Sequence, residues 1–141
     1  MLFRSEGLRP LLGDVEVGAF RNRAGELSQW KPGRIDACSP DLADTRVAVL
    51  IGPGTASSGE AVAVAFKGRV ETRFFGLTTA GLATSNQTIP LPDGSVLMLT
   101  TAVFVDRAGY AYPDGVSPDV PVNAAQDVID IAADWLQSQR R

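Results

Sequence analysis

The apolar run Val47–Ile51 leads into the turn-forming residues Gly52-Pro53-Gly54, and small, helix-tolerant residues follow over Glu60–Phe66. A continuous apolar strand is typical of a sheet covered on both faces, so the pattern indicates a strand, a tight turn and a helix. Ser57 or Ser58 then stands at the helix N-terminus, where free N–H groups and the positive end of the helix dipole would stabilise a developing oxyanion. The pattern predicts an α/β domain with Ser57 placed like a nucleophile.

The same serine also fits an ordinary structural role. Ser57 and Glu60 have the S-x-x-E spacing of a capping box, in which the two side chains satisfy each other's backbone N–H groups at a helix start. Glu60 is therefore expected to cap the helix, and a role in orienting the loop is the alternative. On spacing alone, a nucleophile and a cap are both open for Ser57.

Several motifs of the chain resemble those of the carboxy-terminal processing (tail-specific) serine peptidases, serine peptidase family 41. Gly54–Glu60 resembles the signature G-[ST]-A-S-[AS]-x-E, in which the position of Ser57 is the nucleophile. The other motifs follow in the family's order: Thr79–Gly81 for T-[FA]-G, Ile89–Ser95 for I-P-L-x-D-G-S, Leu99–Ala102 for L-T-T-A and Gly115–Asp119 for G-[IV]-x-P-D. Each motif is weak alone, but their shared order and compatible spacing between Arg46 and Val122 make the resemblance specific.

One position departs from the main branch of that family. Processing proteases use a Ser-Lys dyad whose lysine directly follows the T-F-G motif, whereas this chain has Leu82 there. A leucine side chain cannot accept a proton, so a Ser-Lys mechanism is excluded if the alignment holds. The chain then resembles the tricorn core and related peptidases, in which an upstream histidine is the base and a carboxylate after the serine supports the site.

The chain contains no histidine. The resemblance implies that the histidine, and a G-G-N-type stretch that supplies an oxyanion donor, lie upstream of Met1. We therefore expect a fragment, the C-terminal portion of a catalytic domain, which is inactive alone. A degenerate, non-catalytic relative is the alternative.

The resemblance also implies roles for individual residues. Ser57 attacks a peptide carbonyl to give an acyl-enzyme, and the Ser58 N–H is one oxyanion donor. Gly54 and Gly59 permit a strained turn and the close approach of a substrate backbone, although both also fit ordinary turns. Thr79, Ala80 and Gly81 lie in a loop of small residues that a bound peptide can approach.

The supporting carboxylate is expected near the G-[IV]-x-P-D segment. Asp114 is the first candidate by its spacing from Ser57, and Asp119 is the second. Both aspartates also fit a turn-capping role. No cofactor and no metal site is expected.

The remaining patterns complete an α/β fold. Leu2–Leu12 reads as the end of a helix closed by Gly13, and Val15–Trp30 as a strand pair turning at Arg23-Ala24-Gly25. Lys31–Thr45 is predicted to be a loop and Thr72–Phe75 a strand. Gln87–Leu91 and Ser95–Asp106 form a predicted hairpin, and Ala124–Gln137 a closing amphipathic helix.

The resemblance implies a crotonase-like (ClpP-like) fold, present here as an incomplete domain. Residues 1–141 would then comprise an N-terminal helix, strands and loop (1–45), a motif-bearing core (46–122) and the closing helix (123–141).

The resemblance implies a peptide or protein substrate, and composition bears on the other classes of partner. The net charge is −3 and basic residues are scattered, which disfavours nucleic-acid binding. Cys38 is the only cysteine, so no intrachain disulfide can form. No apolar run is long enough to span a bilayer.

The sequence leaves the compartment undetermined. No signal peptide is present, although a truncated start would have removed one. Members of the family that the chain resembles are often periplasmic or secreted.

An incomplete α/β domain exposes a sheet edge and apolar surface, so we expect a homo-oligomer or association with a missing N-terminal portion. Two other functions are kept as alternatives. One is a non-catalytic ligand-binding protein, like the retinoid-binding relatives of the family. The other is an acyl-CoA-handling enzyme of crotonase type, which the peptidase motifs disfavour because they are not general to that fold.

Overall fold

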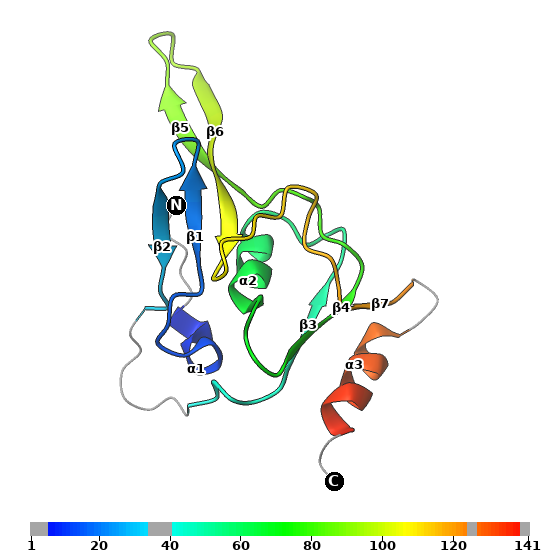
Figure 1. The fold of residues 1–141 in the computed structure, drawn as a ribbon. Helices are drawn as coiled ribbons and strands as arrows, with labels where there is room; N and C mark the ends of the chain where they lie inside the picture. The colour runs from blue at the N-terminus through cyan, green and yellow to red at the C-terminus, as the bar shows by residue number, and fades with distance from the viewer. Residues whose placement is uncertain (1–5, 34–40, 124–126, 139–141) are drawn as a thin grey trace.

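The computed structural model describes residues 6–33, 41–123 and 127–138. The fold is α/β, with one antiparallel and one parallel sheet and helix α2 between them (Figure 1). The strand orders are β2-β1-β6-β5 and β3-β4-β7. In chain order the elements are η1 (Glu6–Leu8), α1 (Arg9–Leu12), β1 (Gly18–Asn22), β2 (Leu27–Trp30), β3 (Val47–Ile51), α2 (Ser58–Phe66), β4 (Thr72–Gly76), β5 (Thr84–Pro90), β6 (Val96–Asp106), β7 (Val120–Pro121) and α3 (Val128–Gln137).

Both predicted strand pairs of the antiparallel sheet are confirmed. The β1–β2 turn contains Gly25 at φ 85°, a left-handed conformation that glycine adopts without steric cost. In the β5–β6 turn, Asp93 Oδ1 accepts bonds from the N–H and hydroxyl of Ser95, at 3.0 and 2.6 Å. Strand β5 begins at Thr84, three residues before the predicted start at Gln87. The described parts of the predicted 31–45 loop contain no helix or strand, and residues 34–40 lie outside the described residues.

The parallel sheet provides the frame of the strand-turn-helix unit. Val47 of β3 pairs with Thr72 of β4, and the register continues to Ile51 and Gly76. The prediction that β3 is covered on both faces is wrong, because its middle residues are only half-buried and Leu50 is 45% exposed. The physical reason is its place at the edge of the sheet, where neighbouring elements cover it incompletely.

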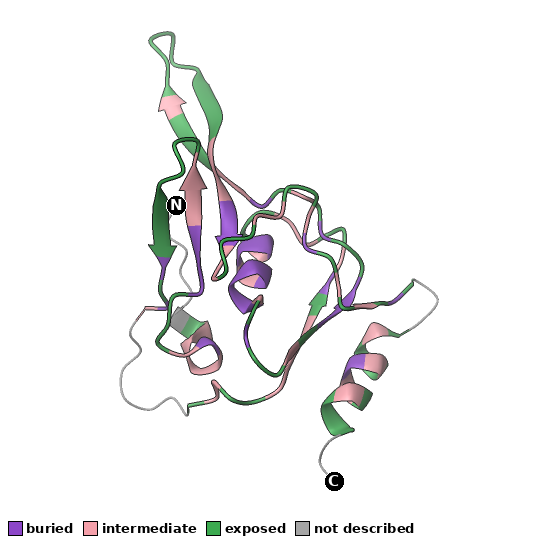
Figure 2. Cartoon of the chain, viewed as in Figure 1, coloured by how far each residue is buried: buried purple, intermediate pink, exposed green. Residues whose placement is uncertain are grey.

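The core gathers around α2, which is the most buried helix in Figure 2. Val64 and Ala65 of α2 are fully buried. Beside them the rings of Phe20, Trp30 and Phe104 pack edge to face, with centroids 4.9–5.5 Å apart. Such packing of aromatic rings fixes the antiparallel sheet against the helix that carries the serine.

Helix α3 packs against β3 and β4 (Figure 1). Asp127 caps it, because its Oδ1 accepts the N–H of Ile129 at 2.8 Å. The predicted closing helix is thus confirmed from residue 128, and residues 124–126 lie outside the described residues. None of the helices described here is long and apolar enough to cross a membrane.

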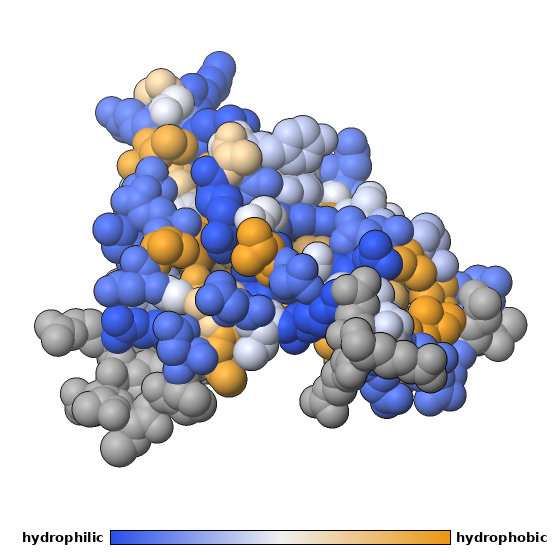
Figure 3. All heavy atoms as spheres, turned by 60° about the horizontal axis from the view of Figure 1, so that its bottom comes forward, coloured by the Kyte–Doolittle hydropathy of each residue, from blue (hydrophilic) through white to orange (hydrophobic). Residues whose placement is uncertain are grey.

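Exposed apolar side chains include Val96, Leu97, Met98 and Leu99 of β6. On the face shown in Figure 3, apolar surface forms several patches among hydrophilic ones. Self-association, or association with a further segment, remains a prediction.

Candidate functional site

The serine turn is the strained point of the backbone. Ser57 precedes α2 with φ 51° and ψ −110°, a conformation that is costly for a residue with a Cβ atom. Ser57 and Glu71 are the described non-glycine residues with positive φ. A serine on a sharp, strained turn between a strand and a helix is the geometry of a nucleophile elbow, which presents its hydroxyl at the end of a sheet.

Hydrogen bonds inside the turn hold this conformation. The N–H of Thr55 donates to the carbonyl of Gly52 at 2.8 Å, and the N–H of Gly59 donates to Ala56 at 2.9 Å. Gly54 and Gly59 are not among the residues with positive φ, and their expected role in the close approach of a substrate backbone remains a prediction. The strain lies at Ser57 itself, because the hydrogen bonds of Glu60 and the helix start over-determine its conformation.

Glu60 is the centre of the site's hydrogen bonding. Its side chain is fully buried, and its two oxygens accept four hydrogen bonds. Oε2 accepts the N–H of Ser57 at 3.0 Å and that of Leu82 at 2.8 Å. Oε1 accepts the hydroxyl of Thr79 at 2.6 Å and the N–H of Gly81 at 2.8 Å.

Four donors satisfy a buried carboxylate, which would otherwise be costly to remove from water. The predicted capping contact is therefore confirmed, since Glu60 accepts the N–H of Ser57. The alternative role is present too, because the same carboxylate holds the Thr79–Leu82 loop against the serine turn.

The Thr79–Leu82 loop lies directly against the serine turn. Ala80 N–H donates to the carbonyl of Thr55 at 2.9 Å, and Thr79 N–H donates to the carbonyl of Val116 at 3.2 Å. With the Gly81 bond to Glu60, the N–H groups of all three predicted substrate-binding residues are used inside the protein. These hydrogen bonds hold the loop in place beside the serine turn, and contact of the three residues with a substrate remains a prediction.

Leu82 stands at the position that the motif resemblance assigns to the lysine of the Ser-Lys branch. Its N–H and that of Ser57 donate to the same oxygen of Glu60, so the two backbones are neighbours. The Leu82 side chain is 55% exposed. The backbone of Leu82 therefore lies beside that of Ser57, and a leucine side chain cannot act as a base.

A pocket of about 700 Å³ opens at Ser57. Its other lining residues come from the hairpin: Thr84–Thr88 of β5, and Met98 and Thr101 of β6. The sequence motifs did not single out β5 as a wall of this pocket, because which strands line a space beside Ser57 depends on the tertiary fold. A run of polar residues beginning directly after the Thr79–Leu82 loop was the available signal.

The other predicted site residues are distributed around the turn. Ser58 is the first residue of α2, so its N–H has no partner within the helix and stands next to Ser57. The exposed Asp114 lines a separate pocket of about 290 Å³ with Lys67 and Ser117, although its backbone lies against Gly81. The carboxylate of Asp119 accepts the N–H of Phe74 at 2.7 Å and thereby joins the chain before β7 to β4.

The two aspartates differ in what the structure shows of them. Asp119 accepts a backbone hydrogen bond that joins two segments of the fold. A role for Asp114 in supporting the site remains a prediction. No group of three or more potential metal-ligating side chains occurs among the residues that the structure describes.

A model of peptidase family S41 matches residues 7–122. The chain belongs to this family. Over 144 aligned residues it is 35% identical to the nisin-resistance protein of Lactococcus lactis subsp. lactis, covering 94% of this chain and 44% of that protein. It is also 34% identical, over 63% of its length and 21% of the relative's, to a carboxy-terminal-processing protease of Bartonella bacilliformis.

Solved structures agree with this family membership. A lipoprotein from Streptococcus agalactiae superposes with a TM-score of 0.79 and 27% identity, covering 95% of this chain and 48% of that one. The photosystem II D1 C-terminal processing protease gives a TM-score of 0.69 and 26% identity, and the match covers 84% of this chain and 30% of that protease. This S41 chain thus spans less than half the length of these relatives.

Proposed function

We propose that this chain carries the nucleophile and one oxyanion donor of a serine peptidase that forms an acyl-enzyme on Ser57. The observation that carries the proposal is the strained Ser57 at the N-terminus of α2, in a chain that belongs to a peptidase family. The same proposal includes peptide or protein substrates and a crotonase-like fold. It also includes the division of the chain into an N-terminal part (1–45), a motif-bearing core (46–122) and a closing helix (123–141).

The reaction would begin with transfer of the Ser57 hydroxyl proton to a base. The serine oxygen then bonds to the peptide carbonyl carbon, and the Ser58 N–H donates to the oxyanion that forms. The tetrahedral species collapses, the C–N bond breaks, and the base returns the proton to the leaving amine. Water attacks the resulting ester by the same route, which releases the acid and restores Ser57.

The base is proposed to be a histidine from a segment outside this chain. Position 82 is leucine and the chain has no histidine, so the chain provides neither the lysine nor the histidine that the resemblance assigns as base. The relatives are more than twice as long as the matched region, which leaves room for such a segment. Asp114 is the proposed supporting carboxylate.

A missing base can be tested by chemical rescue. We would treat the 141-residue chain with a fluorophosphonate probe at increasing imidazole concentrations and map the labelled peptide by mass spectrometry. Labelling of Ser57 that rises with imidazole and disappears in Ser57→Ala is the expected result. Ser58→Ala is the matched control, because it removes the neighbouring hydroxyl and keeps the backbone N–H. Labelling unaffected by Ser57→Ala would overturn the proposal.

A non-catalytic, ligand-binding relative is the second candidate, and Leu82 is the observation that favours it. It predicts no imidazole-dependent labelling at any concentration. The longest polypeptide that the gene encodes would then also fail to react at Ser57.

A further inference from the structure

Strand β6 continues beyond the end of β1 as part of a two-stranded arm, residues Asn86–Thr100. The last residue of β1, Asn22, pairs with Ala102, whereas β5 pairs with β6 as far as Val96. The arm projects from the body of the molecule (Figure 1). A two-stranded ribbon is marginally stable alone in water, so further contacts are expected to stabilise it.

The β6 side of the arm carries an exposed apolar run. Val96 is 56% exposed, Leu97 45%, Met98 59% and Leu99 46%. Successive side chains of a strand point to opposite faces, so this run exposes apolar surface on both faces of the arm. An apolar strand of this kind, when its edge is open, is a template for pairing with another strand.

The hairpin turn fixes which backbone groups of β6 face outward. The N–H of Leu91 donates to the carbonyl of Ser95 at 2.9 Å, and hydrogen-bonded and non-hydrogen-bonded pairs alternate along an antiparallel ladder. The next pair, Pro90 with Val96, is therefore a non-hydrogen-bonded one, which fits the missing N–H of proline. By the same alternation, the N–H and C=O groups of Val96 and Met98 point away from β5.

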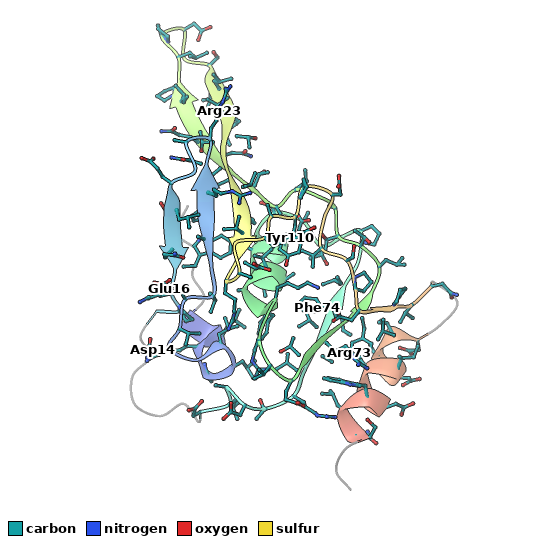
Figure 4. The ribbon with its side chains drawn as sticks, viewed as in Figure 1. Asp14, Glu16, Arg23, Arg73, Phe74 and Tyr110 are labelled. Atoms are coloured by element: carbon teal, nitrogen blue, oxygen red, sulfur yellow. The ribbon has the colours of Figure 1, made fainter. Side chains whose placement is uncertain are left out.

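No strand of the described residues pairs with this edge of β6 beyond the end of β1. A space of about 330 Å³ opens where β1 stops, and it is lined by Arg21–Arg23 and Thr100–Val103. Figure 4 shows Arg23 at this end of β1. The edge of β6 is therefore open for a partner strand beside Val96–Leu99.

The chemistry of the arm favours an uncharged, apolar strand as that partner. Residues 84–105 contain no Lys or Arg, and their one acidic residue is Asp93, whose Oδ1 already accepts two hydrogen bonds from Ser95. The lack of cations disfavours an anionic lipid surface, and the tip of the arm is the polar turn Pro92–Ser95 rather than an apolar one. The same edge of a second copy meets the requirement.

We propose that two copies of this chain pair edge to edge through β6, with Leu97 of one copy opposite Leu97 of the other. In this antiparallel, two-fold arrangement Val96 of each copy pairs with Met98 of the other, and each such pair exchanges its outward N–H and C=O groups. The two arms then form one sheet whose central strands carry the apolar run. The proposal does not depend on acyl-enzyme formation at Ser57.

A cysteine at position 97 tests the pairing directly. In a Cys38→Ser background, Leu97→Cys places two thiols at a non-hydrogen-bonded pair, where Cβ atoms are about 4.5 Å apart and a disulfide can form. We expect a disulfide-linked dimer on mild oxidation, seen by non-reducing electrophoresis. Gln87→Cys is the matched control, because Gln87 is exposed and lies on the β5 side of the arm, opposite Leu99.

Association in solution is measured by sedimentation equilibrium over a range of protein concentrations. Leu97→Lys places like charges opposite each other on the two-fold axis, so we expect the dissociation constant of the dimer to rise about tenfold. Leu27→Lys is the matched control, because Leu27 is 50% exposed and lies on β2, the edge strand at the other side of the sheet. It is expected to leave the dissociation constant unchanged.

Three outcomes would overturn the inference. The first is a chain that stays monomeric at every concentration. The second is an equal loss of association in Leu97→Lys and Leu27→Lys. The third is crosslinking of Gln87→Cys as fast as that of Leu97→Cys, which would place the contact on β5. The crosslinking result does not require Leu97→Lys to fold, and circular dichroism of each variant checks that it does.

Discussion

The hydroxyl of Thr79 donates a 2.6 Å hydrogen bond to Glu60 and accepts the N–H of Val116 at 2.8 Å. This relationship sets the direction of the hydroxyl proton, because the carboxylate can only accept. It connects three segments: the first turn of α2, the loop before β5 and the chain before β7. Since Glu60 also accepts the N–H of Ser57, the hydroxyl of Thr79 is one bond removed from the backbone of the candidate nucleophile.

Replacing Thr79 by Val keeps the shape of the side chain and removes the hydroxyl. The N–H of Val116 then loses its acceptor inside the protein, and Glu60 keeps three of its four donors. We expect the free energy of unfolding to fall by about 1–3 kcal/mol, measured by urea denaturation. Thr78→Val is the matched control, because Thr78 is exposed and its hydroxyl has only a long contact of 3.5 Å, with the hydroxyl of Ser117, among the described side chains. Equal losses in the two variants would contradict the prediction.

Local patterns in the sequence predicted most of the described elements. The strand pairs followed from alternation and from glycine in the turns, and α3 followed from its helical spacing of apolar residues. These features depend on residues a few positions apart, so a single sequence contains the information. Strand β5 was placed too late because Thr84–Asn86 are polar, which fits an edge strand as well as a loop.

The nonlocal features did not follow from the sequence. The bonds from Glu60 to Thr79, Gly81 and Leu82 cross 19 to 22 residues, and no spacing rule predicts them. The exposure of Leu50 likewise depends on which elements cover β3. Ser57 was predicted as the nucleophile from its resemblance to a family motif, whereas the positive φ that strains the turn could be seen only in the structure.

Arg69 is a buried cation without a carboxylate partner among the described ion pairs. Its guanidinium donates to the carbonyls of Leu11, Leu42, Thr45 and Val70 and to the Thr72 hydroxyl, at 2.6–3.0 Å. These bonds tie α1 and the chain before β3 to the start of β4. Arg69→Lys keeps the charge but cannot reach all five acceptors, so we expect a loss of about 2–4 kcal/mol in urea denaturation.

The control for Arg69→Lys is Arg9→Lys. Arg9 pairs with the exposed Asp14 at 3.2 Å, and exposed pairs contribute about 0–1 kcal/mol. If the urea-denaturation midpoints of Arg69→Lys and Arg9→Lys were equal, the five hydrogen bonds of the Arg69 guanidinium would not stabilise the fold.

Tyr112 makes stability depend on alkaline pH. Burial and the 2.6 Å hydrogen bond from its hydroxyl to Asp106 Oδ2 raise the pKa of Tyr112 well above its usual value of about 10. The phenol therefore ionises more easily in the unfolded chain, so its contribution to stability is complete below about pH 10 and is lost as the pH rises further. Burial lowers the pKa of nearby Lys67, which acts in the opposite direction as the pH approaches its unfolded pKa of about 10.4.

The test compares urea midpoints at pH 8 and 11 for the unsubstituted protein and Tyr112→Phe. We expect the unsubstituted protein to lose more stability between the two pH values, because Phe has no phenol to ionise. Tyr110→Phe is the control, since Tyr110 is 65% exposed and stacks edge to face on Tyr112. A Tyr112→Phe protein with an unchanged pH dependence would contradict the assignment.

Trp135 holds α3 on the parallel sheet. The guanidinium groups of Arg46 and Arg73 lie 5.1 and 5.6 Å from its ring centroid, and the ring of Phe75 lies 5.7 Å from it. A helix of this length is marginal alone in water, so its stability depends on such contacts. We expect Trp135→Ala to reduce the free energy of unfolding by about 2–3 kcal/mol and to lower the helical signal in circular dichroism.

Leu136→Ala is the matched control for this contact, because it truncates the neighbouring residue, which is 37% exposed. Trp135→Phe separates the contribution of the arginine–ring contacts from that of apolar packing. It keeps an aromatic face for the arginines and removes part of the apolar area. We expect its stability to lie between those of Trp135→Ala and the unsubstituted protein. If Trp135→Ala and Leu136→Ala had the same midpoint, α3 would be held by its other contacts with β3 and β4.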